Sequence, residues 1–295
     1  MPKINKTIKY LIITALLLAG VLGTILMVLT DKPKQPQWDI ERNIRYSFTL
    51  ENKTAKPMQN IVFKTYSPVI ISSTQKLMEL NSTHTFTKQP DIYGNQVMEF
   101  NIDFIPPYGK KKISITAGLL LSKIVAGTDS KDALFVSEQP LIETNSEAIQ
   151  KLANNLKSQA GDLQKNIFNW LVDNIEYSGY GMRDKGALYA IQELQGDCTE
   201  YAYLNVALNR VLGFKSRAVN GYVVTHDKKL AASGFHTWSE IWLDNGWQVI
   251  DAQKKALLEN QENYIAMNIV VDTNKSNKAF KRFWVSTPDL IVTMK

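Results

Sequence analysis

The chain has 295 residues, of which 44% are hydrophobic and 21% charged, so it can bury a sizeable core and is neither disordered nor fibrous. Its formal net charge is +6, yet acidic residues lie among the lysines and arginines along the whole chain. No basic block of the kind that marks a nucleic-acid groove is present, so we expect no nucleic-acid partner. The single cysteine excludes an intramolecular disulfide.

The N-terminal segment contains an uncharged apolar run at residues 10–29, long enough as a helix to span roughly 30 Å of hydrocarbon. Lys3, Lys6 and Lys9 precede it, which favours a cytoplasmic N-terminus. We predict a single-pass membrane anchor at residues 1–30 and a tether at 31–37, with the remainder on the extracytoplasmic side, periplasmic or extracellular. A cleavable signal peptide is the alternative, but the apolar run continues well past the small residues near Gly23.

Short alternating runs separated by turn residues fill the region from 38 to 121. Examples are Ile44–Leu50, Ile61–Tyr66 and Val97–Ile102. This spacing predicts an antiparallel β-sandwich of six or seven strands at 38–121, followed by a linker at 122–145. His84 has no acidic or cysteine partner near it in the sequence, so we interpret it as a strand-surface residue.

A second module, residues 146–295, begins with two predicted amphipathic helices, one after Ser146 and one from Asp162 to Ile175. A third helix starts at Gly196–Leu204, with Asp197 as its N-cap. That start puts Cys198 in the first turn, where unpaired N–H groups and the helix dipole favour the thiolate. A small buried apolar cysteine is the alternative. Glu200 is either a first-turn carboxylate favoured by the dipole or a site residue.

Three strands are predicted after this helix, at 217–224, 235–243 and 247–251, with His236 and Asp251 at strand ends. A two-residue turn at Asn245–Gly246 would pair Asp251 with Glu240 and leave His236 out of register. Contact between His236 and Asp251 then requires a longer loop near Leu243 or a bulge. A half-buried strand histidine and a strand-end aspartate are the structural alternatives, and His226, in a polar turn, is the weaker base.

Taken together, a cysteine at a helix start, a histidine and an aspartate supply a nucleophile, a base and a carboxylate that orients the base. A glycine just before the nucleophile, Gly196, leaves room for a substrate acyl group or only closes the preceding loop. The sequence identifies no second oxyanion donor beyond the Cys198 backbone N–H.

Three blocks resemble the transglutaminase-like superfamily of papain-related folds: G-D-C-T-E-Y-A at 196–202, F-H-T-W-S-E-I at 235–241 and G-W-Q-V-I-D-A at 246–252. The resemblance implies an α+β fold in which a papain-like core, a helix bundle on an antiparallel sheet, follows the β-sandwich. It implies Cys198 as nucleophile, His236 as general base and acid, and Asp251 as the orienting residue. Gly196 and Trp238 are candidate substrate-binding residues, although core packing explains Trp238 equally well. No cofactor or metal is expected.

The resulting hypothesis is a membrane-anchored cysteine-dependent enzyme that cleaves or transfers a peptide or carboxamide acyl group through a thioester. Its partner is a protein or peptide substrate, and hydrolysis is slightly favoured over transamidation because it needs no second substrate site. Two alternatives stay open. One is a non-catalytic cell-envelope binding module on the same fold, and the other is an enzyme that matures one dedicated peptide.

Overall fold

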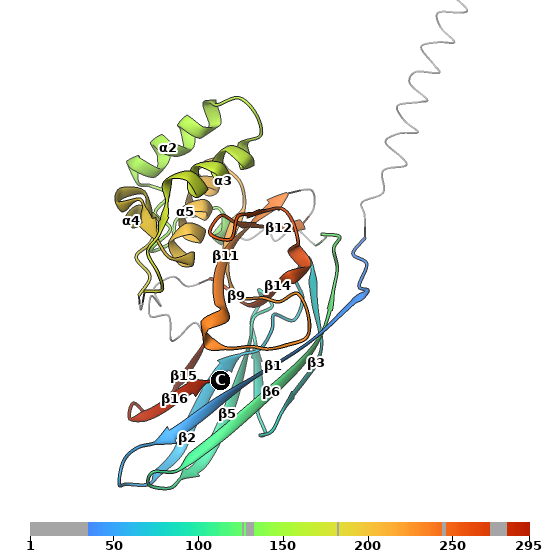
Figure 1. The fold of residues 1–295 in the computed structure, drawn as a ribbon, viewed down its shortest axis with the longest axis vertical. Helices are drawn as coiled ribbons and strands as arrows, with labels where there is room; N and C mark the ends of the chain where they lie inside the picture. Colours follow the sequence, from blue (N-terminus) through green and yellow to red (C-terminus); the bar gives the residue numbers. More distant parts are fainter. Residues whose placement is uncertain (1–34, 126, 128–132, 182, 244–245, 272–281) are drawn as a thin grey trace, which may run out of the picture. The chain divides into compact units, whose positions relative to one another are not determined.

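The structure is a computed structural model that describes residues 35–125, 127, 133–181, 183–243, 246–271 and 282–295. The predicted anchor at 1–30 and most of the tether lie outside these ranges. In the part of the chain that is described, no helix has the length and apolar character needed to cross a membrane. Residues 36–295 form one compact unit of mixed α and β structure, in which antiparallel pairing dominates the sheets (Figure 1).

Two facing sheets, here called the sandwich, contain every strand of the region 38–121. Their strands are β1 (Ile40–Asn52), β2 (Met58–Tyr66), β3 (Gln75–Ser82), β4 (Thr87–Pro90), β5 (Gln96–Ile105) and β6 (Lys110–Leu121). One sheet has the order β10-β1-β6-β3 with β16 also paired to β1, and the other has the order β15-β2-β5-β4. The long β1 and β6 pair from Ile40↔Leu121 to Glu51↔Lys110.

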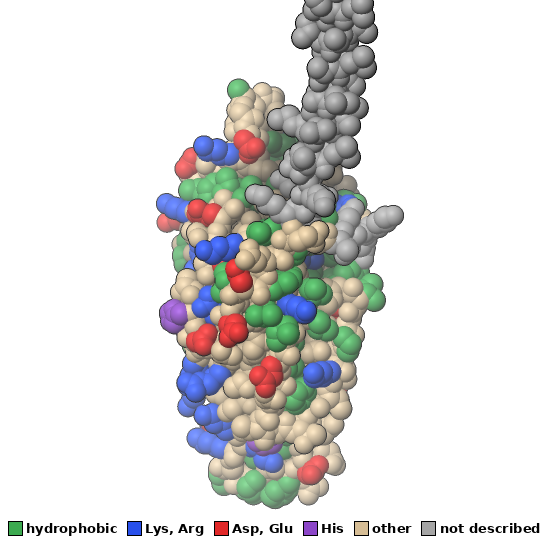
Figure 2. All heavy atoms as spheres, turned by 90° about the vertical axis from the view of Figure 1, so that its right-hand side faces the viewer, with side chains coloured by type: hydrophobic (Ala, Val, Ile, Leu, Met, Phe, Trp, Pro, Cys, Tyr) green, Lys and Arg blue, Asp and Glu red, His purple; other side chains and the backbone are tan. Residues whose placement is uncertain are grey.

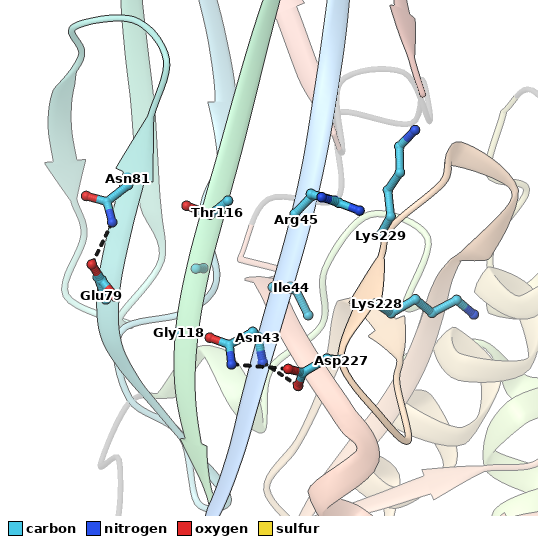
Figure 3. A pocket seen from close by; sticks show the side chains of 11 residues that line it. Asn43, Ile44, Arg45, Glu79, Asn81, Thr116, Gly118, Asp227, Lys228 and Lys229 are labelled. Atoms are coloured by element: carbon cyan, nitrogen blue, oxygen red, sulfur yellow. Dashed lines mark hydrogen bonds between the residues drawn. The ribbon is translucent and has the colours of Figure 1, made fainter.

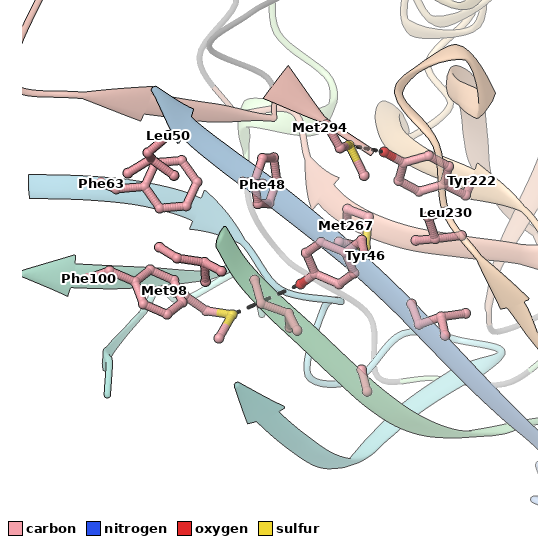
Figure 4. Close-up of a cluster of buried hydrophobic side chains, with 14 of the residues drawn as sticks. Tyr46, Phe48, Leu50, Phe63, Met98, Phe100, Tyr222, Leu230, Met267 and Met294 are labelled. Atoms are coloured by element: carbon pink, nitrogen blue, oxygen red, sulfur yellow. Dashed lines mark hydrogen bonds between the residues drawn. The ribbon is translucent and has the colours of Figure 1, made fainter. Parts of the chain in front are cut away.

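The sandwich core follows from the period-two pattern of its strands. In β1, Ile44, Tyr46, Phe48 and Leu50 are each at most 1% exposed, and Phe48 packs on Phe63 of the facing sheet with ring centroids 5.0 Å apart (Figure 4). Burying one such side chain contributes roughly 1.5–3 kcal/mol. The alternation therefore fixes which face of each strand turns inward.

Strands from the second half of the chain complete the sandwich. They are β10 (Lys228–Lys229), β15 (Phe283–Val285) and β16 (Leu290–Met294). On one edge of β1, β10 pairs in parallel at Ile44↔Lys228, and β16 pairs antiparallel from Phe48↔Met294. All three strands lie within residues 146–295, which were predicted to form the second module, yet they pair only in the two sandwich sheets.

A separate five-stranded antiparallel sheet has the order β13-β12-β11-β9-β14. Its strands are β9 (Ser216–Val223), β11 (Phe235–Leu243), β12 (Gly246–Asp251), β13 (Ala256–Leu257) and β14 (Tyr264–Ile269). Four helices lie on one side of it (Figure 1): α2 (Glu147–Ser158), α3 (Leu163–Asn174), α4 (Ala187–Glu193) and α5 (Cys198–Val211). Helix α5 packs directly on β9 and β11, so its start lies beside this sheet.

Short elements complete the described chain: the paired strands β7 (Glu176–Tyr177) and β8 (Gln195–Gly196), and the single 3-10 turns η1 (Ala133–Phe135), η2 (Ala232–Gly234) and η3 (Gln261–Asn263). The surface charge is mixed. On the face drawn in Figure 2, acidic side chains lie among the lysines and arginines, as expected from their interleaving in the sequence.

Candidate active site

Cys198 is the first residue of α5, and a capping box holds that helix start in place. The Asp197 side chain accepts a hydrogen bond from the Thr199 N–H at 2.9 Å, and the Glu200 side chain accepts one from the Asp197 N–H at 2.9 Å. The predicted N-cap is therefore confirmed. The Cys198 thiol is half-buried at the positive end of the helix dipole, where an anion is favoured.

Gly196 and Glu200 fit against each other behind the thiol. A Cβ at position 196 would lie 2.3 Å from the Glu200 Cβ, so only glycine lets Glu200 fold back over the backbone. The second Glu200 oxygen accepts the Lys185 N–H at 2.8 Å. Both residues thus stabilise the helix start and the loop before it, and neither lines the cleft described below.

His236 and Asp251 are in direct contact, with 2.6 Å between Nε2 and Oδ2. The ladder between β11 and β12 runs without a register shift and pairs Ser239 with Ile250. Continued by one step, it places Asp251 opposite Trp238, so the two site residues are diagonal neighbours on one face. A two-residue turn at Asn245–Gly246 would have paired Asp251 with Glu240, but Glu240 pairs with Val249, and His236 and Asp251 meet without a bulge in this ladder.

Asp251 is 2% exposed and accepts two further hydrogen bonds. The Tyr264 hydroxyl donates to Oδ2 at 3.0 Å, and the Lys254 N–H donates to Oδ1 at 3.1 Å. Burial, and then the charge of Asp251, raises the pKa of Tyr264, which keeps this hydroxyl a donor. Sequence reasoning missed Tyr264 because it belongs to β14, which adjoins β9 rather than the strand that carries Asp251.

Trp238 supports His236 from within the core. Its ring stacks on the imidazole with 6.3 Å between centroids, and it is 1% exposed, outside the cleft lining. Its indole N–H donates to Glu240 at 3.3 Å, and Glu240 forms a buried ion pair with Arg217 at 2.7 Å. Burial lowers the pKa of Arg217, and Glu240 opposes that shift. The arrangement restrains the imidazole ring on the side away from solvent.

Cys198 and His236 line one cleft of about 500 Å3, here called the Cys198 cleft. Its walls are Tyr177 and Tyr180, the segment 232–236, Gln253 with Lys254, and Arg282. The neighbours of the two site residues also lie close together, with 3.5 Å between the Thr199 and Thr237 hydroxyl oxygens. Helix and strand therefore bring the Cys198 thiol and the His236 imidazole to the same opening.

The tyrosine wall of the cleft is held by the same backbone that presents the thiol. Strands β7 and β8 pair at Tyr177↔Gly196, and the Gly181 N–H donates to the Asp197 carboxylate at 3.0 Å. Burial, and then the nearby charges of Cys198 and Asp184, raises the pKa of Tyr180, against the opposing effect of Arg282. A neutral hydroxyl is thus maintained at the rim.

The other two histidines lie elsewhere. The rings of His84 and His226 each face the hydroxyl of the preceding threonine, at 3.0 and 3.1 Å. A hollow of about 380 Å3 on the sandwich is lined by polar residues, and its carboxylates Glu79 and Asp227 already accept hydrogen bonds from asparagines (Figure 3). Within the described ranges, no three His, Cys, Asp or Glu residues are grouped so as to hold a metal ion.

Comparison with known proteins gives a family match and a fold match. Residues 147–252 match the model of the transglutaminase-like superfamily. A crystal structure from Cytophaga hutchinsonii, described as a candidate cysteine protease, superposes with a TM-score of 0.56 at 16% identity, covering 87% of this chain and 92% of that one. This similarity shows a shared fold.

Two further solved structures match this chain with lower TM-scores. The periplasmic domain of TgpA from Pseudomonas aeruginosa gives a TM-score of 0.36 at 15% identity, covering 76% of this chain and 72% of that chain. The transglutaminase of red sea bream gives 0.28 at 12% identity, covering 78% and 50%. No curated protein sequence matches the chain.

Proposed function

Because residues 147–252 belong to the transglutaminase-like superfamily, we propose that this protein is a cysteine-dependent enzyme acting on a peptide or carboxamide carbonyl. The observation that carries the proposal is the 2.6 Å contact of His236 with Asp251 beside a cleft that also contains Cys198. Cys198 is the nucleophile, His236 the general base and acid, and Asp251 the residue that orients the base.

The contact between His236 and Asp251 supports different roles for the two imidazole nitrogens in this proposal. Asp251 contacts Nε2, so the neutral ring carries its proton on Nε2 and presents the Nδ1 lone pair to a proton donor. Proton transfer from the thiol to Nδ1 gives a thiolate and an imidazolium. The Asp251 carboxylate then stabilises that positive charge.

In the proposed reaction the thiolate of Cys198 attacks the substrate carbonyl carbon and forms a tetrahedral oxyanion. His236 gives its Nδ1 proton to the leaving nitrogen, so ammonia or an amine departs and a thioester remains. Water, deprotonated by His236, then attacks the thioester, and the acid product leaves as the thiol is restored. An amine in place of water would give transamidation.

Donors are needed where the oxyanion develops. The Cys198 backbone N–H at the helix start is one, and we assign the Tyr180 hydroxyl as the second, because it lines the same cleft and its raised pKa keeps it protonated. Tyr180→Phe should lower kcat by about 100- to 1,000-fold, with little change in the alkylation of Cys198. Equal losses in both measurements would contradict this role.

The first test is the pH dependence of iodoacetamide reaction at Cys198 in the full-length chain, whose single cysteine makes labelling unambiguous. We expect reaction well below the ordinary thiol pKa of about 8.5. His236→Ala should remove this low-pH reaction, while His226→Ala should not. A normal thiol profile, the same in all three proteins, would refute the enzyme and leave a binding module.

A second assay separates the two reaction outcomes. A glutamine-containing peptide is incubated with a labelled amine, with Cys198→Ala as control. We expect ammonia release without label in the product, because no acceptor site is needed for hydrolysis. Label incorporation would instead assign transamidation.

We further propose that residues 1–30 anchor the chain in a membrane with the enzyme on the extracytoplasmic side. The support is the uncharged run at 10–29 after three lysines. Protease digestion of intact spheroplasts should degrade the domain, and carbonate extraction should leave the full-length chain in the membrane. Recovery of a shortened soluble chain would indicate a cleaved signal peptide instead.

A further inference from the structure

Arg282 places a fixed positive charge in the wall of the Cys198 cleft, and it comes from outside the matched family region. It lies immediately before the sandwich strand β15. Its carbonyl accepts the Thr65 hydroxyl at 2.8 Å and the Tyr66 N–H at 3.4 Å, both from β2. The sandwich therefore holds the backbone of a residue that lines the cleft.

The guanidinium of Arg282 is restrained by apolar groups more than by polar ones. It lies 5.6 Å from the centroid of the Phe235 ring and 6.0 Å from that of Phe283. Its Nη1 faces the Ala232 carbonyl at 3.5 Å, and its buried Nε has no hydrogen-bond partner. No carboxylate of the described residues forms an ion pair with it.

The charged residues that line the Cys198 cleft are all cationic. Its lining contains the cations Lys254 and Arg282, and no described lining residue is acidic. The carboxylates close to the site, Asp184, Asp197 and Asp251, are each at most 6% exposed and do not line the cleft. A planar guanidinium presents paired N–H donors that match a carboxylate, so its unused donors favour an anionic partner.

We propose that Arg282 selects substrates that bear a carboxylate close to the carbonyl attacked by Cys198. This inference rests on the proposed function for the site itself and adds the substrate class, an acidic peptide. The carboxylate comes either from an acidic side chain or from a free chain terminus, because the same guanidinium binds both.

The test uses small electrophiles, so it needs no knowledge of the natural substrate. Each probe is a chloroacetyl group on an amino acid, and the Cys198 sulfur displaces chloride. The neutral probe is N-chloroacetyl-glutamine amide. One acidic probe, N-chloroacetyl-glutamate α-amide, carries only a side-chain carboxylate, and the other, N-chloroacetyl-glutamine, carries only an α-carboxylate. Rates with free cysteine normalise the intrinsic reactivities.

In the full-length chain we expect at least one acidic probe to react roughly five- to tenfold faster than the neutral probe, as for a half-buried ion pair. Arg282→Gln should abolish this preference, and Arg282→Lys should retain part of it. Arg45→Gln, which removes the same charge from the sandwich hollow of Figure 3, should leave the preference unchanged. Which acidic probe is preferred identifies the source of the carboxylate.

A preference that survives Arg282→Gln, or that is lost equally in Arg45→Gln, overturns the inference. If Arg282→Gln does not fold, the wild-type preference is measured against salt, since an ion pair is screened and a salt-independent preference likewise overturns it. Failure of the proposed function has a different signature: the neutral probe then reacts no faster than free cysteine at low pH, whatever the ratio of the probes.

Discussion

Replacing Asp251 by asparagine tests whether the carboxylate, rather than its shape alone, organises the site. Oδ2 of Asp251 is in contact with His236 Nε2 and accepts a hydrogen bond from the Tyr264 hydroxyl, and Oδ1 accepts one from the Lys254 N–H. An amide offers one acceptor oxygen and one donor group. Whichever way it is turned, at least one of these donors faces an N–H instead of an oxygen.

Leaving a buried donor unsatisfied costs about 1–3 kcal/mol, so Asp251→Asn should lower the free energy of unfolding by that amount. A neutral partner also no longer stabilises the His236 imidazolium. The thiolate of Cys198 should then form at higher pH, by about one pH unit for each 1.4 kcal/mol of lost interaction. Urea denaturation gives the first quantity, and the pH profile of iodoacetamide reaction gives the second.

Asp173→Asn, an exposed change of the same chemistry in α3, should leave both measurements unaltered. If Asp251→Asn matched the wild type in stability and in alkylation profile, the assignment of Asp251 as the residue that orients the base would be incorrect. A loss of stability without any change in the profile would leave Asp251 with a purely structural role.

Three other predictions follow from the packing around the site. Gly221→Ala places a Cβ 2.0 Å from the Ile265 carbonyl oxygen, so urea denaturation should show a loss of about 3 kcal/mol or more, whereas Gly234→Ala should be nearly neutral. Glu240→Ala leaves Arg217 buried and unpaired and should cost about 3–5 kcal/mol in the same assay. Burial raises the pKa of four tyrosines, Tyr46, Tyr203, Tyr222 and Tyr264, above the unfolded value near 10. Their contribution to the free energy of unfolding should therefore be fully present below pH ~10 and be lost as the pH rises above it. The absorbance of their phenolates should appear only when the protein unfolds.

Elements with strong local signals could be predicted from the sequence. The cap at Asp197 and the apolar stripe that follows define α5, which runs from Cys198 to Val211. The predicted strand at 235–243 coincides with β11. These signals act within one or two turns or strands, so they need no knowledge of the fold.

Other features depend on contacts between distant segments. Helix α4 has seven residues and follows Gly186, whose φ of 96° and lack of a side-chain cap give no local start signal. The offset of His236 and Asp251 could not be obtained from a turn motif, because the register is set by the whole sheet. Tyr264 and Arg282 reach the site only through strand pairing, which sequence spacing does not reveal.

The sandwich positions part of the Cys198 cleft, because two segments of the cleft wall are built on it. Strand β10 pairs with β1, and Leu230, 2% exposed, packs in the sandwich core two residues before the segment 232–236 that lines the cleft. On the other sheet, β15 pairs with β2 and fixes the position of Arg282. Cys198 and His236 come from α5 and β11, within the region that matches the family model, whereas this part of the cleft wall is positioned by the sandwich. Under the proposed function, a change in the sandwich would therefore alter substrate choice while leaving the contact between His236 and Asp251 unchanged.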